Sequence, residues 1–447
     1  MKKILSFMLA AVMIFSLTAC SMSTNNSQNA KAGRVYFLNF KPEVADVYKE
    51  IAEKYKQETG VEVKVVTAAS NTYETTLKSE IAKKEAPTIF QINGPVGYQS
   101  WARYCLDLSD TKLYSYLTDK NLAVKNSDGV FGIPYVVEGY GIIYNDAIMK
   151  KYFALKDKAV SISKAEDIKS FDTLNAVVTD MTKHKAELGI DGVFASTSMS
   201  NGEQWRWTSH LANVPVYYEM KEKSDASTVL TTLNAKEVDF SYSSNYKKVF
   251  DMYLDNSATQ KGLLSGKTVE NAMAEFALGK AAMVQNGNWA WEQISNVKGN
   301  VVKSEDIKFL PIYMGIDGEE DQGICIGTEN YLAINKTASE ADQKASIAFL
   351  EWLFSSETGK DYVANKLNFI SPFNTFKDDE KPKDPLVREI FNWMEKDVNN
   401  LEWTFNSFPS QQFKDDFGNA ILDYIQGKND WKHVETTFKN SWKSERK

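Results

Sequence analysis

Two tryptophans follow directly on a turn in the segment GKAAMVQNGNWAW. The apolar run Ala281 to Gln285 predicts a strand, and Asn286-Gly287-Asn288 is typical of a turn. The residues Glu292 to Ile294 favour a helix after it, in which Trp289 and Trp291 point about 200° apart, because each residue advances by roughly 100°. We expect Trp289 to face outward, where an indole can stack on a flat apolar ligand surface, and Trp291 to pack inward. The alternative is that both rings belong to a core.

A second aromatic stretch, Gln204-Trp205-Arg206-Trp207, follows the polar loop Ser196 to Gly202. Such a loop is typical of a strand end above a binding cleft. Trp205 and Trp207 are therefore both candidates for stacking on a ligand. Of the two, we expect Trp205 to face the ligand and Trp207 to be its core partner; either ring could also be purely core.

Polar side chains that could bind hydroxyl groups follow two predicted strands. Lys41 and Glu43 come after the strand Val35–Phe40, and Asn93 comes after the strand Thr88–Ile92. The carboxyl ends of parallel strands share one edge of a sheet, where ligands bind, and charged partners form the stronger hydrogen bonds. We expect these residues to contact a ligand. The alternative is two solvated charges in a first helical turn and an ordinary turn residue.

Two further candidates come from the middle and the end of the chain. Glu138, in the stretch VVEGYG, could supply a carboxylate to the cleft or could be a surface acid. Phe413 begins the apolar stripe of a predicted C-terminal helix and is a candidate for closing the lower rim of the cleft. A lone aromatic residue on such a stripe more often belongs to a core.

The elements that position these residues follow an α/β pattern. A helix is predicted to open at Lys41-Pro42-Glu43, because proline suits its first position, and to stop at Thr59-Gly60. With the strands Val35–Phe40, Val61–Val66 and Thr88–Ile92, this predicts a parallel α/β sheet. Further strands are expected at 307–312 and 331–334, and further helices at 272–277, 341–355 and around Phe413 to Tyr424.

The composition limits the classes of function. A chain of 447 residues is long enough for two or more hydrophobic cores. The formal net charge is −7, and only five of the 52 basic residues are arginine. No basic patch points to nucleic acid, and no P-loop pattern points to ATP hydrolysis. We expect a monomer without a cofactor.

The first residues read as an export signal. Lys2 and Lys3 precede the apolar run Ile4–Leu17, which is too short to span a bilayer, and Leu17-Thr18-Ala19-Cys20 is similar to a bacterial lipobox. This similarity implies a signal peptide over residues 1–19, acylation of Cys20 and a lipid-anchored flexible tether over residues 20–33. The alternative is a plain secretory signal with a chance cysteine.

The mature chain resembles the carbohydrate-binding extracellular solute-binding proteins of ABC importers, the family that includes maltose-binding protein. The resemblance rests on the order and spacing of these stretches: FLNFKPEVADVYKEIAEKYKQETGVEVKVV, APTIFQINGP, GIPYVVEGYGIIYN, AEFALGKAAMVQNGNWAW and KASIAFLEWLFSSETGKDYV. It extends from Arg34 to about Phe376. Thr88 stands where the family usually has an aspartate, and residues 215–265 match no recognisable part of it.

The resemblance implies a two-lobed α/β fold of the type II binding-protein class, with a ligand cleft between the lobes. The chain is expected to cross between lobes near Gly141–Tyr144, Asp321–Gly327 and Ser371–Phe376. Lobe 1 is then 34–141 plus 328–371, and lobe 2 is 145–320 plus 377–447. The resemblance also implies a sugar-stacking tryptophan at Trp289, a second stacking ring near Trp205 and a cleft carboxylate at Glu138.

The implied function is capture of an oligosaccharide and its delivery to the transmembrane subunits of an ABC permease, without enzymatic activity. Three alternatives are open: a binder of another solute such as a polyamine, an anchored glycoside hydrolase, and a metal-binding lipoprotein. A hydrolase needs two carboxylates about 5–9 Å apart, and no partner for Glu138 is visible. The three histidines, His184, His210 and His433, lack the spacing of a zinc motif, so we expect no metal site.

Cys105 and Cys325 remain after Cys20. Their isolation gives neither a CxxC motif nor a metal-ligand spacing. A disulfide between them is one possibility; two separate buried thiols are the favoured one.

Overall fold

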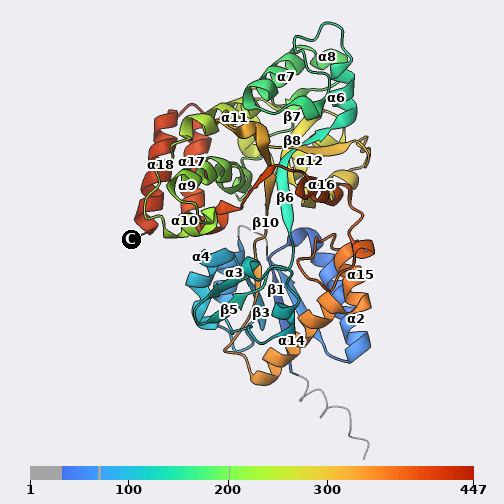
Figure 1. The fold of residues 1–447 in the computed structure, drawn as a ribbon, viewed down its shortest axis with the longest axis vertical. Helices are drawn as coiled ribbons and strands as arrows, with labels where there is room; N and C mark the ends of the chain where they lie inside the picture. Colours follow the sequence, from blue (N-terminus) through green and yellow to red (C-terminus); the bar gives the residue numbers. More distant parts are fainter. Residues whose placement is uncertain (1–32, 69–71, 201, 447) are drawn as a thin grey trace, which may run out of the picture.

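The computed structural model describes residues 33–68, 72–200 and 202–446, which form two bodies stacked along the long axis of the molecule (Figure 1). The signal peptide, Cys20 and all of the tether except Gly33 lie outside these residues. No helix in the described part of the chain combines the length and hydrophobicity needed to cross a bilayer.

Lobe 1, the lower body in Figure 1, is built on a four-stranded sheet in the order β11-β3-β1-β2. The strands are β1 (Val35–Asn39), β2 (Val63–Thr67), β3 (Ile89–Ile92) and β11 (Tyr331–Ile334). β1 pairs in parallel with β2 and β3, as the β-α-β-α-β pattern predicts, while β11 is antiparallel to β3. The late strand β11 returns from the other lobe, so the sheet joins two distant parts of the sequence.

The helices of lobe 1 cover both faces of this sheet. They are α2 (Ala45–Thr59), α3 (Tyr73–Glu80), α4 (Gly94–Trp101), α5 (Lys112–Ser115), α14 (Glu340–Ser355) and α15 (Glu357–Asn365). A short hairpin of β4 (Val124–Asn126) and β5 (Gly129–Gly132) completes the lobe. α2 ends at Gly60, whose φ of 74° is a left-handed conformation that glycine adopts at little cost. The expected stop signal is confirmed.

Lobe 2 is built on a mixed sheet in the order β12-β10-β6-β8-β7, with β9 also paired to β6. The strands are β6 (Glu138–Asn145), β7 (Gly192–Phe194), β8 (Ala281–Gly287), β9 (Ile307–Leu310), β10 (Gln322–Gly327) and β12 (Asn399–Leu401). β6 is antiparallel to β8, β9 and β10. The sequence predicted a parallel α/β sheet, and that expectation holds for the pairs β1–β2, β1–β3, β7–β8 and β10–β12.

Most helices of the molecule pack around the second sheet. They are α6 (Asp146–Phe153), α7 (Phe171–Lys183), α8 (Lys185–Leu188), α9 (Ala212–Lys223), α10 (Thr228–Asn234), α11 (Ser243–Asp255), α12 (Val269–Ala277), α13 (Trp291–Ser295), α16 (Pro385–Met394), α17 (Gln411–Ile425) and α18 (Trp431–Glu445). The segment 215–265, which the resemblance did not cover, supplies most of α9, all of α10 and α11. These helices pack with α17 and α18 on one side of lobe 2 (Figure 1).

The chain passes between the sheets at places that differ from the expected crossing segments. Gly141–Tyr144 lies inside β6, and Asp321–Gly327 ends in β10, both in the second sheet. The chain changes sheets just before Glu138 and again between Gly327 and Tyr331. Apolar residues stand on both sides of the first junction, Val136 and Val137 before Glu138 and Tyr140 after it, so hydrophobicity alone does not mark where one sheet ends.

The third crossing also lies later than expected. Phe373 still pairs with Leu117 of lobe 1, and Lys360 of lobe 1 still bonds Glu380. Ile370 touches the core of the second sheet, but Phe373 and Phe376 pack in the core of lobe 1, and the chain returns to the second sheet's core at Leu386 of α16. The expected segment Ser371–Phe376 therefore belongs to lobe 1.

Cys105 and Cys325 are both buried free thiols, one in each lobe. They form no disulfide, so the favoured expectation is confirmed and the two thiols act as small apolar side chains.

Candidate ligand-binding site

Polar residues gather where the first sheet faces lobe 2. Lys41 follows β1, and Glu329 lies between β10 and β11. Asn93 follows β3 and occupies the N-cap position of α4. The ends of parallel strands meet at one sheet edge, as predicted for Lys41 and Asn93. The Asn93 side chain makes no capping bond, and its Oδ1 is buried without a hydrogen-bond partner. Its carbonyl oxygen is thus available to a ligand.

Lys41 and Glu138 form a buried ion pair at this edge. Lys41 Nζ lies 2.8 and 2.9 Å from the two carboxylate oxygens of Glu138, and the residues are 4% and 2% exposed. Glu43 adds a longer contact, 3.6 Å from Lys41 Nζ. Burial alone would lower the pKa of Lys41, but the carboxylates of Glu138, Glu43 and Glu329 outweigh it and raise that pKa. The ammonium therefore stays charged.

Lobe 2 contributes a group of aromatic rings to the junction. Trp289, in the 3₁₀ turn η8 (Asn288–Ala290), lies 6.0 Å from Trp205, 5.7 Å from His210 and 6.5 Å from Trp403, measured between ring centroids. Trp205 and Trp289 are half-buried, whereas His210 and Trp403 are buried. We call these four residues the aromatic cluster. Two half-buried indoles supported by buried rings make a firm apolar surface.

A π-helix positions Trp205. The π-helix η6 (Arg206–Leu211) directly follows this tryptophan, and such π-helices often occur at functional sites. The buried Arg206 guanidinium lies 4.0 Å from the centre of the Trp205 ring. Burial lowers the pKa of Arg206 to about 9, so it remains a cation at neutral pH. This cation–π contact between Arg206 and Trp205 stabilises the position of the indole.

A pocket joins the ion pair to the aromatic cluster. It is lined by Glu43, Glu138, Asn288, Trp289, Glu292 and Asp384, together with residues 367–369. Burial raises the pKa of Glu292, and it raises the pKa of Asp384 to about 6. The pocket holds only about 30 Å³, far below the roughly 300–1,000 Å³ of ordinary ligand sites. A larger ligand therefore requires the lobes to separate.

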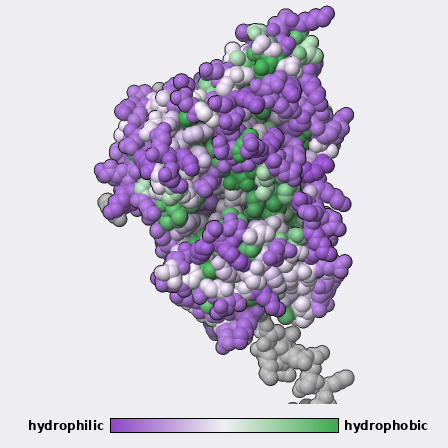
Figure 2. Space-filling view, viewed as in Figure 1, coloured by the Kyte–Doolittle hydropathy of each residue, from purple (hydrophilic) through white to green (hydrophobic). Residues whose placement is uncertain are grey.

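Figure 2 shows hydrophobic surface gathered across the middle of the molecule, between the two lobes, while both ends are mostly hydrophilic. The view agrees with the position of the aromatic cluster and the pocket at the junction. Exposed apolar surface in such a place is typical of a binding site.

Several buried polar atoms near the junction lack a hydrogen-bond partner. They are Asn93 Oδ1, His210 Nε2, Thr328 Oγ1, Asn330 Nδ2, Trp403 Nε1 and Asn406 Oδ1. Asn406 lies against Gly94 at the start of α4, so this group spans both lobes. Buried polar atoms are nearly always satisfied, which indicates that a polar ligand or water completes these bonds.

His210 is held neutral at this site. Burial, aided by the nearby Arg206 charge, places the pKa of His210 well below its ordinary value. Its Nδ1 contacts Ser209 Oγ at 3.0 Å, which leaves Nε2 as the unpaired ring nitrogen. A neutral imidazole offers a ligand either a donor or an acceptor there.

Two predicted site residues lie elsewhere. Trp207 is 3% exposed and packs on Phe250 and Tyr253 in the core of lobe 2, so only its role as a core partner is consistent with the structure. Phe413 is fully buried among aromatic rings of α17 and α18 and forms no rim. Both side chains are buried in the hydrophobic core of lobe 2 and do not reach the junction between the lobes.

Trp291 also differs from expectation. It begins α13, and the helical turn directs it away from Trp289, as predicted. It is only half-buried, however, and packs at the edge of a core rather than within it.

Sequence reasoning missed other residues of the junction: His210, Asn288, Glu292, Glu329, Asp384, Trp403 and Asn406. Glu329 stands out because burial raises its pKa to about 7, with Lys41 opposing the shift and Glu138 adding to it. The one available signal was its position two residues after the second expected crossing segment, Asp321–Gly327. Trp403 and Asn406 come from a segment that only the fold brings to the junction.

Comparison with known proteins identifies the family. Residues 50–389 match the family described as bacterial extracellular solute-binding protein. The chain belongs to this family. It is also 21% identical to a multiple sugar-binding protein of Streptococcus mutans over 430 residues, covering 92% of this chain and 91% of that protein.

Solved structures of low sequence identity share the fold. A chitin oligosaccharide binding protein matches with a TM-score of 0.69 and 16% identity, covering 93% of this chain and 99% of that one. A raffinose complex of the solute-binding protein RafE matches with a TM-score of 0.68 and 17% identity, covering 93% and 100%. A sugar transporter protein from Bacillus licheniformis bound to stachyose matches with a TM-score of 0.67 and 17% identity, covering 92% and 100%. The expected type II binding-protein fold is confirmed.

Proposed function

We propose that this protein is the substrate-binding component of an ABC sugar importer and that it captures an oligosaccharide between its lobes. The observation that carries the proposal is one pocket lined by both Trp289 and the ion-paired Glu138. A sugar ring has an apolar face for the indole and hydroxyl groups for the charged pair. The relatives named above supply the sugar class and the import role.

Each residue of the site has a role in this proposal. Trp289 and Trp205 stack on sugar rings, and Lys41 and Glu138 bind hydroxyl groups. Asn93 adds a hydrogen bond from lobe 1. Glu43 is half-buried beside Lys41 and lines the pocket, so it is a further partner for hydroxyl groups.

Capture in this proposal is a hinge movement. The ligand contacts both lobes only when they are close, so it favours the closed form by its greater affinity for that form. The closed protein then docks on the transmembrane subunits of the permease. Acylated Cys20 holds a monomeric protein at the outer face of the cell membrane through the tether.

A role as a glycoside hydrolase is disfavoured by the hydrogen bonds of Glu138, even though burial raises the pKa of this carboxyl. A general acid needs a proton to give, whereas both oxygens of this carboxylate accept bonds from the Lys41 ammonium. Such a pair suits binding of hydroxyl groups.

A second candidate ligand is a cationic solute such as a polyamine. Four carboxylates line the pocket: Glu43, Glu138, Glu292 and Asp384. Lys41 already neutralises part of this charge, and the aromatic cluster offers stacking surface, so we favour a neutral sugar.

Calorimetric titration decides between the two. Raffinose, stachyose, maltose and chitin oligosaccharides are tested beside spermidine and putrescine. The proposal predicts binding of at least one sugar and its weakening by Trp205→Ala. Trp352→Ala is the matched control, because Trp352 is half-buried on α14 and bonded to Glu58, away from the junction. Binding of a polyamine but of no sugar contradicts the proposal.

A further inference from the structure

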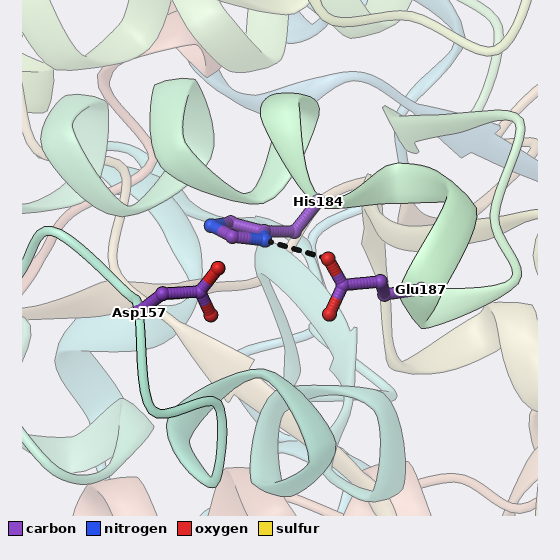
Figure 3. A group of neighbouring side chains, drawn as sticks. All are labelled: Asp157, His184 and Glu187. Atoms are coloured by element: carbon purple, nitrogen blue, oxygen red, sulfur yellow. Dashed lines mark hydrogen bonds and ion pairs between the residues drawn. The ribbon is translucent and has the colours of Figure 1, made fainter.

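Three side chains at the far end of lobe 2 point toward one shared space (Figure 3). His184 lies between α7 and α8, Glu187 lies on α8, and Asp157 lies in the loop after α6. One nitrogen or oxygen from each residue lies within 4.8 Å of the other two. In Figure 1 these helices lie at the tip of the molecule, away from the junction between the lobes.

The two carboxylates of this group lie close together, which favours the binding of a cation. Asp157 and Glu187 are carboxylates that repel each other across the imidazole of His184. In the described part of the chain, one hydrogen bond connects members of this group. It joins His184 Nδ1 and Glu187 Oε1, which are 3.3 Å apart. That distance is at the long end for such a bond. Among residues 33–68, 72–200 and 202–446, Asp157 forms no ion pair.

A buried carboxylate lies beside the group and fixes one side of it. Asp180, 4% exposed, accepts a hydrogen bond of 2.8 Å from the Ala159 backbone, which fixes the loop that carries Asp157. Its Oδ1 also lies 4.0 Å from Nε2 of His184. A metal-binding histidine commonly turns its second ring nitrogen toward a carboxylate. In His184, Nδ1 contacts Glu187, and Nε2 lies on the side of Asp180 at a distance longer than a hydrogen bond.

We propose that Asp157, His184 and Glu187 bind a divalent transition-metal ion, for which zinc is the best match. One imidazole and two carboxylates are ligands that zinc accepts, and water fills the remaining tetrahedral position. Magnesium favours oxygen ligands alone and is a poor match. The bound ion links the loop after α6 to the turn between α7 and α8. No zinc motif is visible in the sequence, because Asp157 is distant from His184 along the chain.

The test is calorimetric titration of zinc chloride into tag-free protein that has been treated with EDTA and dialysed. The wild type is expected to bind one zinc ion, and magnesium chloride is expected to give no heat of binding at this site. His184→Gln is expected to abolish the zinc signal. His433→Gln is the matched control, because His433 is exposed on α18 with no part in the group, and it is expected to bind zinc like the wild type.

Two further measurements separate a metal site from an ordinary hydrogen bond. Asp180→Asn is expected to weaken zinc binding about tenfold, the usual effect of losing a partner behind a metal ligand. Zinc is expected to raise the melting temperature of the wild type and of His433→Gln, but not of His184→Gln. Absence of zinc binding by the wild type, or equal binding by His184→Gln, overturns the proposal.

Discussion

Lys41 and Glu138 form a buried ion pair across the boundary between the lobes, with Nζ 2.8 Å from Oε1 and 2.9 Å from Oε2. Lys41 follows the first strand of lobe 1, and Glu138 is the first residue of the central strand of lobe 2. The pair therefore ties the two sheets together at the point where the chain crosses. It also lines the same junction as the tryptophans, so one contact serves both stability and the proposed binding of hydroxyl groups.

Replacing Lys41 is expected to lower the free energy of unfolding more than replacing Glu138. Lys41→Met leaves a buried Glu138 carboxylate without its cation, which typically costs about 3–5 kcal/mol of the free energy of unfolding. Glu138→Gln costs less, because Lys41 keeps Glu43 at 3.6 Å and the field of Glu329. The double variant Lys41→Met/Glu138→Gln recovers much of the loss. Urea denaturation of the three variants measures this; additive losses would contradict the coupling.

Glu329 is expected to make stability depend on pH. Burial raises its pKa to about 7 in the folded protein, above the roughly 4.3 of an unfolded glutamate. The folded state then holds the proton more tightly, so this group's contribution to stability is present below about pH 4 and is lost as pH rises toward about 7. Glu329→Gln should raise the melting temperature relative to wild type at pH 8 and lose most of this advantage at pH 4.

Thermal melts at the two pH values test the role of Glu329, with Glu50→Gln on the exposed face of α2 as the control. The control should behave like the wild type at both pH values. If Glu329→Gln gave the same shift in melting temperature at pH 8 and pH 4, titration of this carboxyl would not be the cause.

Solution scattering tests the movement of the lobes. The pocket between Trp289 and Glu138 holds only about 30 Å³, so a sugar can enter only if the free protein opens. We expect the radius of gyration of the free protein to exceed that of the protein saturated with its sugar. An identical radius in both states would count against a hinged clamp.

Cys20→Ser tests the anchor. If the cysteine of Leu17-Thr18-Ala19-Cys20 is acylated, its replacement should release the protein into the medium or leave the signal peptide uncleaved. Cell fractionation followed by mass measurement of the N-terminus distinguishes these results. Unchanged membrane retention of a processed Cys20→Ser protein is the result that rules out a lipid anchor at this position.

The fold was predictable where local pattern decides it. The strand before Lys41, the helix that stops at Gly60 and the strand before Trp289 all carry period and stop signals in a few neighbouring residues. The site was predictable in part for the same reason: Lys41 and Asn93 follow strands whose ends must meet.

The remainder of the site depends on distant parts of the chain. Trp403 reaches the junction because β12, the strand before it, pairs with β10. Glu329 reaches the junction because the chain passes there from β10 in the second sheet to β11 in the first. For Phe413 the core alternative, which its apolar stripe favoured, is the correct one, because α18 covers that stripe. Trp207 is the core partner that the sequence favoured, whereas no signal in the neighbouring residues indicated the π-helix after Trp205.

Trp289 is the residue on which the proposed binding depends most. Its ring lies over Gly287 of β8, close enough that a Cβ at that glycine would be 2.2 Å from the indole. We expect Trp289→Ala to weaken sugar binding at least about tenfold, roughly 1.4 kcal/mol, because the stacking surface is lost. Gly287→Ala should weaken binding as well, since it displaces the same ring without removing it.

Trp291→Ala is the matched control for this pair of variants. Trp291 is half-buried on α13 and outside the aromatic cluster, so its loss should lower the melting temperature by less than a core truncation and leave affinity nearly unchanged. Calorimetric titration and thermal melts on all three variants decide the matter. Loss of binding by Trp291→Ala with wild-type affinity in Trp289→Ala would mean that the two rings have exchanged roles, and unchanged affinity in all three would move the binding site away from this pocket.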